Sequence, residues 1–397
     1  MPPRHHAKKT LLFSLFYFDG KGASVRPDKY RLLLEGAKYA DTHGFVAVWT
    51  PERHFHPFGG IYTNPAITSA ALATVTAHLR LRAGSVVAPL HQFIRIAEEW
   101  AMVDNLSGGR VDVSFASGWH ADDFALYPSR YPTRKSAMVE AIQDVQKLWR
   151  GEQVSAENGS GKLIHLRIFP RPVQPDLPIW ITCSGNPDTF ELAGQLGGGV
   201  LTHLLGQSLD ELETKIALYR TALTQHGHQG TGHVTLMLHT FLGESREKVR
   251  QTVREPLCEY LSSSLSLVEQ QLKNTGLEMR GNVIPWRKSS GSAVEGRPTP
   301  SPAQQAASSG NHRELLAQAF ERYFEQAGLF GTPESCQQML DRLRAAGVDE
   351  VACLVDFGVE ADAVLRSLEF LNSMKSIHER WEQHAARVQI AGFNEKF

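Results

Sequence analysis

Eight short apolar segments alternate with longer amphipathic stretches along this chain. They are rich in β-branched and aromatic residues and lie at 11–18, 45–49, 81–87, 111–117, 178–183, 199–203, 234–241 and 351–357. Segments that are apolar throughout, instead of alternating with polar residues, are typical of parallel strands buried on both faces. Eight such strand–helix units predict an α/β fold, a closed (β/α)8 or TIM barrel.

The main alternative is an open, doubly wound sheet. Dinucleotide-binding sheets of that type carry a glycine-rich fingerprint after the first strand. This chain reads FDGKGASVRP there, which lacks the fingerprint. We therefore favour the barrel, as a single domain over residues 1–397.

Two segments exceed what a barrel needs. Residues 152–177 are expected to form a hairpin-like insertion, whose exit is marked by Pro170, Pro172 and Pro175. Residues 281–311 are rich in Ser, Gly, Pro and Ala and lack a repeating apolar period. This composition is typical of a mobile loop, and it fits a lid over the barrel mouth and a solvated linker equally well.

Composition limits the function classes. Of 397 residues, 41 are Lys or Arg and 42 are Asp or Glu, so the formal net charge is −1 and no global charge favours nucleic acid or an anionic membrane. No apolar run is long enough to span a bilayer, and the basic N-terminus does not form a signal peptide. The cysteines are widely spaced, which fits a reducing cytoplasm; they are Cys183, Cys258, Cys336 and Cys353.

The active site of a barrel lies at the carboxyl ends of its strands, so the polar residues there are the candidates for chemistry. After the second strand, the stretch 49–60 holds Glu52, Arg53, His54 and His56 within five positions. Single members of this set could be ordinary ion pairs or surface residues, but together they favour a catalytic site. We expect no metal, because no third ligand follows at a familiar spacing.

Two further strand ends offer surfaces for a flat ligand. After the fourth strand, Ser117 and Gly118 are small enough for the backbone to approach such a ligand closely. Trp119 and His120 follow, and His120 is expected to face the cavity. After the third strand, the pair Val86–Val87 forms an apolar wall that could equally be ordinary core.

A helix begins soon after the fifth strand. Backbone N–H groups near Gly185 and Asn186, with the hydroxyl of Thr189, would form a phosphate site at its start, although a plain helix cap explains the same residues. Arg134, at the start of an earlier helix, could supply a matching positive charge.

Three stretches of the chain together resemble the bacterial luciferase-like flavin monooxygenases. They are ERHFHPFGGIYTNPAITSAALATVT, AEEWAMVDNLSGGRVDVSFASGWHADDF and SGNPDTFELAGQLGGGVLTHLLGQ. The similarity covers most of residues 10–260 and returns near the end. It is closest to the branch associated with nonribosomal peptide and polyketide biosynthesis.

The resemblance implies a TIM barrel that binds reduced FMN supplied by a separate flavin reductase. Dioxygen then forms a flavin C4a-peroxide, which oxygenates a small substrate or one held on a carrier protein. It also implies a homodimer.

Site residues carry over by position in the resembling stretches. Val86–Val87 matches the family's non-prolyl cis peptide beneath the flavin ring. Ser117, Gly118 and Trp119 match the segment at the ring edge. The residues matching the phosphate contacts are Gly185, Asn186 and Thr189 in the phosphate loop, with Arg134 as a second contact.

Arg53 departs from the luciferase pattern. Luciferase has Glu-His-His-Phe where this chain has Glu52-Arg53-His54-Phe55, so the first histidine is replaced. This argues against light emission and moves the acid/base role to His54, His56 or His120. One hypothesis is that Arg53 stabilises the negative peroxyflavin, because a guanidinium stays charged and offers several donors.

Two other functions fit the same barrel. One is hydride transfer with a deazaflavin (F420), as in other members of the superfamily. The other is a non-enzymatic flavin-binding relative, which would need a blocked mouth.

Overall fold

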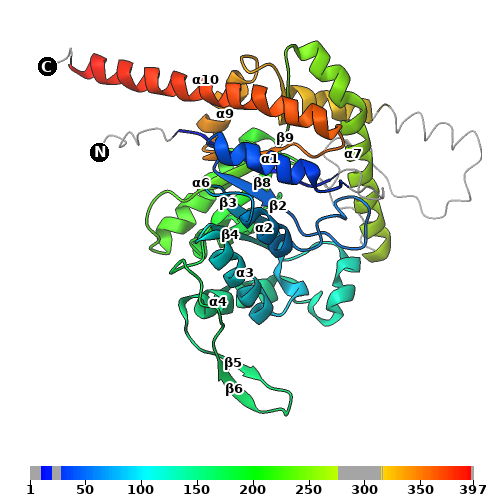
Figure 1. Ribbon diagram of the computed structural model, residues 1–397, viewed down its shortest axis with the longest axis vertical. Coiled ribbons are helices and arrows are strands. Elements are labelled where there is room, and N and C mark those ends of the chain that lie inside the picture. Colours follow the sequence, from blue (N-terminus) through cyan, green and yellow to red (C-terminus); the bar gives the residue numbers. More distant parts are fainter. Residues whose placement is uncertain (1–9, 20–27, 276–313, 315, 395–397) are drawn as a thin grey trace, which may run out of the picture.

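The computed structural model describes residues 10–19, 28–275, 314 and 316–394 of the chain, and Figure 1 shows its arrangement. Eight parallel strands close into a ring in the order β1-β2-β3-β4-β7-β8-β9-β11, and β11 pairs with β1 to complete it. The predicted TIM barrel is therefore confirmed, and the open sheet is wrong.

Each predicted apolar segment overlaps one strand of the ring, and β2, β3, β9 and β11 each extend one residue beyond their segments. The strands are β1 (Leu12–Phe16), β2 (Ala47–Thr50), β3 (Arg80–Val87), β4 (Val111–Ala116), β7 (Ile179–Thr182), β8 (Gly199–His203), β9 (Val234–Leu242) and β11 (Glu350–Leu354). Their side chains are almost all buried, because the barrel interior lies on one face and helices lie on the other.

Helices separate the strands and cover the outside of the ring (Figure 1). They are α1 (Arg31–Thr42), α2 (Pro65–Ala73), α3 (Phe93–Ser107), α4 (Arg134–Arg150), α5 (Pro187–Gln195), α6 (Leu209–Gln225), α7 (Arg246–Thr275), α9 (Gln337–Ala345) and α10 (Ala361–Asn394). Short helical turns η1 (Ala88–Leu90), η2 (Ala121–Leu126), η3 (Pro128–Arg130) and η4 (Tyr323–Ala327) lie between them. In the part of the chain that the structure describes, every helix is too short or too polar to span a bilayer.

Among the residues that the structure describes, three strands lie outside the ring. β5 (Val154–Glu157) and β6 (Leu163–Leu166) pair antiparallel within the segment 152–177 and project from the barrel as a hairpin (Figure 1). β10 (Gly328–Gly331) pairs with the second half of β9. The segment 281–311, for which a lid or a linker was expected, lies outside the described residues.

A network of buried charges lies inside the barrel near the amino ends of the strands; we call it the floor network. Arg82 of β3 donates to Asp112 of β4 at 2.6 Å and to Glu350 of β11 at 2.7 Å. Ser14 and His233 also hydrogen-bond the Glu350 carboxylate. Each charged group in this network therefore has an opposite charge at hydrogen-bond distance.

Aromatic rings complete the packing of the floor network. The Arg82 guanidinium lies 4.8 Å from the ring centre of Trp49 and 4.6 Å from that of Trp180. Burial alone would raise the pKa of Glu350, but the charges of Arg82 and His233 and the hydrogen bonds to the carboxylate hold it well below its ordinary value. Glu350 is therefore ionised at neutral pH, and the floor network joins the strands β1, β3, β4 and β11.

Candidate active site

Glu52 joins two strand ends at the barrel mouth. It follows β2, and its Oε2 accepts a hydrogen bond of 2.7 Å from the backbone N–H of Val87 at the end of β3. Its Oε1 is shared by the Nε2 atoms of His54 at 2.8 Å and His91 at 2.5 Å. The Glu52 side chain is almost fully buried, so this Glu52 clamp is a fixed part of the mouth.

The Glu52 clamp holds charge. Burial alone would raise the pKa of Glu52, but hydrogen bonds from His54 and His91 and the charge of His91 lower it below its ordinary value. Burial would likewise lower the pKa of His91, yet the hydrogen bond and the charge of Glu52 raise it. The carboxylate and a protonated His91 thus stabilise each other.

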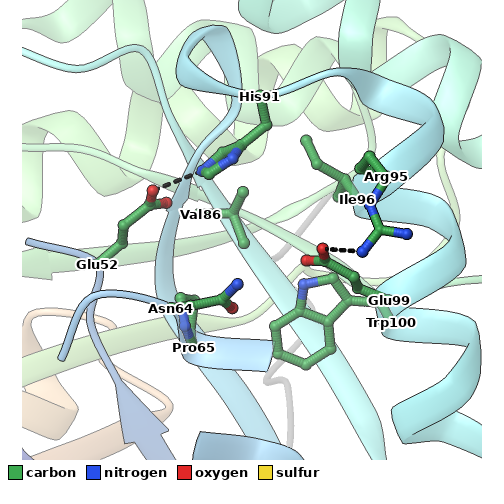
Figure 2. A pocket seen from close by; sticks show the side chains of 9 residues that line it. All are labelled: Glu52, Asn64, Pro65, Val86, His91, Arg95, Ile96, Glu99 and Trp100. Carbon is green, nitrogen blue, oxygen red and sulfur yellow. Dashed lines mark hydrogen bonds and ion pairs between the residues drawn. The ribbon is translucent and has the colours of Figure 1, made fainter. Parts of the chain in front are cut away.

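A pocket lies beside the Glu52 clamp, between the starts of α2 and α3. Figure 2 shows Glu52 and His91 joined by their hydrogen bond on one side of it, with the ion pair of Arg95 and Glu99 at 2.8 Å on the other side. The lining residues are Glu52, Asn64, Pro65, Val86, His91, Arg95, Ile96, Glu99 and Trp100.

The three groups of the Glu52 clamp are of types that bind divalent metals. Their candidate ligand atoms on Glu52, His54 and His91 all lie within 4.8 Å of one another. Both imidazoles, however, converge on one carboxylate oxygen, and the other oxygen is taken by Val87. His91 is thus the third potential ligand that spacing in the sequence did not indicate, and hydrogen bonds account for the contacts among the three groups.

Arg53 lies next to Glu52 in sequence and belongs to a separate cluster. Its Nη1 donates to Asp123 Oδ2 at 2.9 Å, and both side chains are more than nine-tenths buried. The guanidinium carbon also lies 5.6 Å from the ring centre of Trp119. Within the described chain, Nε and Nη2 of Arg53 have no hydrogen-bond partner.

His120 completes this second cluster, the Arg53 cluster. Its Nδ1 lies 3.8 Å from Asp123 Oδ1, and its ring packs edge-on against Trp119. Among the residues that the structure describes, neither ring nitrogen of His120 finds a hydrogen-bond partner, and Asp123 Oδ1 finds none either. Buried polar groups are nearly always hydrogen-bonded, so such a group of exceptions marks a place for a ligand.

Burial controls ionisation in the Arg53 cluster. It lowers the pKa of Arg53 and raises that of Asp123, because desolvation exceeds the attraction between the two charges. Burial and the charge of Arg53 also lower the pKa values of His56 and His120. Both histidines are therefore neutral at neutral pH.

The loop after Arg53 folds back on itself. His56 Nδ1 accepts the backbone N–H of Phe58 at 3.1 Å, and Phe55 adopts a left-handed backbone with its ring 65% exposed. This places His54 in the Glu52 clamp and His56 within electrostatic range of Arg53 and His120. The four candidates between 52 and 56 therefore belong to two clusters.

One expectation about β3 is wrong. The non-prolyl cis peptide lies at Gly84–Ser85, not at Val86–Val87. The pairing of β3 with β4 is irregular between Gly84 and Val86, so the unusual backbone coincides with that irregularity. Only glycine fits there, since a Cβ on Gly84 would lie 2.8 Å from the Phe16 ring. Val86 is buried and Val87 is held by Glu52.

The end of β4 lies against the end of β3. Gly118 has a φ of 75°, and a Cβ on it would lie 2.9 Å from Val87 Cγ1, so only glycine permits this approach. Ser117, half-buried, precedes it. The guanidinium of Arg134 donates to the backbone oxygens of Gly118 at 3.2 Å and Tyr131 at 2.9 Å. Arg134 thus supports the strand end from below the surface.

The candidate phosphate loop lies after β7, next to β4 in the ring. Gly185 and Asn186 are exposed, and Asn186 Oδ1 caps α5 by accepting the N–H of Asp188 at 3.0 Å. Thr189 lies in the first turn of α5, and its N–H points to the carbonyl of Asn186. The helix cap is present, and the acidic Asp188 already lies near the positive end of the helix.

The sequence interpretation missed partners at the mouth. His91 lies directly after η1 and Asp123 lies three residues after His120, so both follow strand ends and could have been considered on that ground. A third group is Asp356, after β11, which accepts a hydrogen bond of 3.2 Å from Tyr62. Burial and the nearby carboxylate of Asp19 raise the pKa of Asp356 to about 7.

The chain is similar to known proteins in both sequence and fold. The sequence profile of the family described as luciferase-like monooxygenase matches residues 11–350. The oxygenase component of the flavin-dependent trigonelline monooxygenase of Acinetobacter baylyi is 30% identical over 249 residues, which cover 61% of this chain and 68% of that protein.

Two other similarities bear on the cofactor. The F420-dependent hydroxymycolic acid dehydrogenase of Mycobacterium tuberculosis is 27% identical over 189 residues, or 45% of this chain and 51% of that protein. The oxygenating constituent of 3,6-diketocamphane monooxygenase of Pseudomonas putida, solved in complex with FMN, has a TM-score of 0.70 at 14% identity. That likeness covers 93% of this chain and 98% of the other, and it concerns the fold.

Proposed function

The chain belongs to the luciferase-like monooxygenase family, and from this premise we propose that it is the oxygenase component of a two-component, FMN-dependent monooxygenase. In this proposal it would bind reduced FMN, which would supply the two electrons for oxygen activation, so that one oxygen atom of dioxygen goes to an organic substrate and the other to water. The observation that carries the proposal is the Arg53 cluster, where buried polar atoms without partners face one another at the barrel mouth.

The residues at the mouth fit a flavin. The ends of β3 and β4 approach closely at Val87 and Gly118, and a glycine at such a place lets a flat ring come close to the backbone. We assign the flavin phosphate to the loop before α5, where Gly185 is exposed and Thr189 lies in the first turn of the helix. Bound reduced flavin would supply the electrons that activate dioxygen.

The chain's own side chains then have separate tasks. Glu52 fixes the backbone of Val87, and with it the β3 end on which the ring would lie. Neutral His120 can accept a proton from the substrate at neutral pH, because burial and the charge of Arg53 lower its pKa, whereas the accepting nitrogen of His56 is already used by the Phe58 N–H. Water is limited at Arg53 and His120, since both are almost fully buried.

Partners and context extend the same proposal. A relative named an oxygenase component supports a separate flavin reductase as the source of reduced FMN. We further propose that the enzyme acts as a homodimer in the cytoplasm, on a small or carrier-bound substrate of natural product biosynthesis. These parts rest on the family resemblance and on the absence of a spanning helix among the described residues.

Hydride transfer to or from F420 is the second candidate. It is favoured by the similarity to the F420-dependent hydroxymycolic acid dehydrogenase. The two chemistries differ in their need for oxygen, so they can be separated without knowing the substrate.

The deciding experiment supplies either reduced FMN with ¹⁸O₂ or F420 without oxygen to the purified protein. Candidate substrates are free acids and the same acids loaded on carrier proteins. The proposal predicts a product that gains one ¹⁸O atom, only with FMN and oxygen. Oxygen-independent turnover with F420 would establish the second candidate instead.

A further inference from the structure

Arg53 offers a vacant pair of donors. A guanidinium has a side-on pair of N–H groups, formed by Nε and Nη2, that matches the two oxygens of a carboxylate. Asp123 uses only Nη1 of Arg53, and within the described residues Nε and Nη2 have no partner. Only 4% of Arg53 is exposed, so bulk solvent does not reach these donors.

Such a pair of donors is not a feature of a structural ion pair. Burying donors without acceptors destabilises the fold, and arginine in the floor network shows the alternative, since Arg82 is bonded to two carboxylates. His120 adds two more unpartnered nitrogens across Asp123, with 3% of the residue exposed. Two buried side chains with unpartnered nitrogens therefore lie on either side of Asp123.

Trp119 is the part of the Arg53 cluster that reaches solvent. Its ring lies over the guanidinium of Arg53 and is 49% exposed. An exposed side chain changes rotamer at little energetic cost, whereas Arg53 and His120 are held from all sides. A ligand can therefore reach the vacant donors when Trp119 turns outward.

The local charge limits the ligand to a monoanion. The positive charge of Arg53 is opposed by Asp123 at 2.9 Å and, at longer range, by Asp122, while His120 is neutral. A dianionic phosphate would find little net attraction in these surroundings. A carboxylate carries one charge and matches the side-on geometry, so bidentate hydrogen bonds can hold it despite the weak field.

We propose that Nε and Nη2 of Arg53 bind a carboxylate of the organic substrate, with His120 as a second donor and Trp119 as the side chain that covers it. This inference rests on the proposed function for the presence of a substrate site, and it assigns the substrate class: an organic acid whose carboxylate is anchored in the Arg53 cluster.

The test measures ligand binding in the absence of turnover. Its result therefore does not depend on whether the protein oxygenates a substrate. Isothermal titration of the full chain with benzoate and octanoate, against benzamide and octanamide as neutral counterparts, should show binding of the acids only. Arg53→Gln should weaken acid binding roughly 10- to 100-fold, as expected for lost hydrogen bonds to a charged group. Arg53→Lys should recover part of it.

Asp123→Asn separates this role from a structural one. Asparagine can still accept the hydrogen bond from Arg53 Nη1, but the opposing negative charge is gone, so acid binding should become about tenfold tighter. A purely structural Asp123 predicts weaker binding instead. This variant also keeps the test valid if Arg53→Gln fails to fold.

Four results would overturn the proposal. They are no binding of either acid by the unmodified protein, equal binding of acids and amides, unchanged acid binding in Arg53→Gln, and weaker acid binding in Asp123→Asn. A separate titration with FMN tests whether the flavin phosphate, instead of a substrate carboxylate, binds to the Arg53 donors. Loss of FMN affinity in Arg53→Gln would assign the donors to the flavin phosphate, whereas unchanged FMN affinity is expected here.

Discussion

The two ends of the barrel interior treat buried charge in opposite ways. In the floor network, Arg82 forms direct hydrogen bonds with Asp112 on the neighbouring strand β4 and with Glu350 across the barrel interior on β11. In the Arg53 cluster, Arg53 has one partner, and Nε and Nη2 have none among the described residues. Both regions are buried to a similar degree, so exposure does not explain the difference.

The difference indicates where stability and function lie. A complete network removes the penalty for burying charge, and it fixes the strands on which the mouth is built. An incomplete network, such as the Arg53 cluster, retains the free-energy penalty for burying charge until a ligand binds. The predictions below test this contrast, beginning with the largest expected effect.

Breaking the floor network should have the largest effect on stability. Arg82→Met leaves the carboxylates of Asp112 and Glu350 buried without their shared cation, which should lower the free energy of unfolding by about 3–5 kcal/mol. Urea denaturation monitored by circular dichroism measures this loss. A decrease below about 1 kcal/mol would show that the floor network is not a unit of stability.

The Glu52 clamp should give an intermediate effect. Glu52→Gln replaces the carboxylate that accepts hydrogen bonds from His54, His91 and Val87 by a neutral amide. This change should lower the free energy of unfolding by about 2 kcal/mol near pH 6. The same variant should lower the pKa of His91, which NMR titration of the histidine ring can follow.

The pH dependence of that loss has a definite sign. The folded-state pKa of His91 is raised, so its contribution is lost as the pH rises through that pKa, and the lowered pKa of Glu52 means its contribution is lost only in acid. The unmodified protein and Glu52→Gln should therefore converge at high pH. A difference that stays constant to pH 10 would contradict the ionic description.

A smaller effect of opposite sign is expected at Asp356. Its folded-state pKa is raised to about 7, so the unmodified protein should lose stability as the pH rises from about 4 to 7, where only the unfolded chain releases the proton. Asp356→Asn removes this loss and should be more stable at pH 8 by at least about 1 kcal/mol. Thermal denaturation at pH 5 and pH 8 compares the two proteins; a variant equally destabilised at both would refute the pKa shift.

The smallest change in stability is expected at the Arg53 cluster itself. The double variant Arg53→Gln with Asp123→Asn replaces a poorly satisfied pair by a neutral one, so the free energy of unfolding should change by less than about 1 kcal/mol. Substrate oxidation should nevertheless be abolished. If the free energy of unfolding of the double variant falls by several kcal/mol, the Arg53 cluster stabilises the fold as the floor network does, and the difference between the two regions is refuted.

The fold could be predicted from sequence because its signal is local. Each strand is a largely apolar segment. Each of the eight predicted segments, from 11–18 to 351–357, overlaps one strand of the ring. The segment 49–60 was also identified correctly as part of the mouth, since position after a strand is enough to place residues there.

Partner choice at the mouth could not be predicted in the same way. Glu52 bonds to His91 across 39 positions, and Arg53 bonds to Asp123 across 70, so both contacts depend on the closure of the ring. The resemblance placed the cis peptide at Val86–Val87, two residues from its position at Gly84–Ser85. Sequence identifies which residues reach the mouth, but packing decides how they pair.

The central claim is that the mouth of this barrel controls the reaction of reduced FMN with dioxygen. The most direct measurement mixes the anaerobic complex of the protein and reduced FMN with oxygen and follows the flavin absorbance over time. The account predicts two resolved phases, with final flavin oxidation slower than for free reduced FMN. A single phase at the rate of free FMN would contradict it.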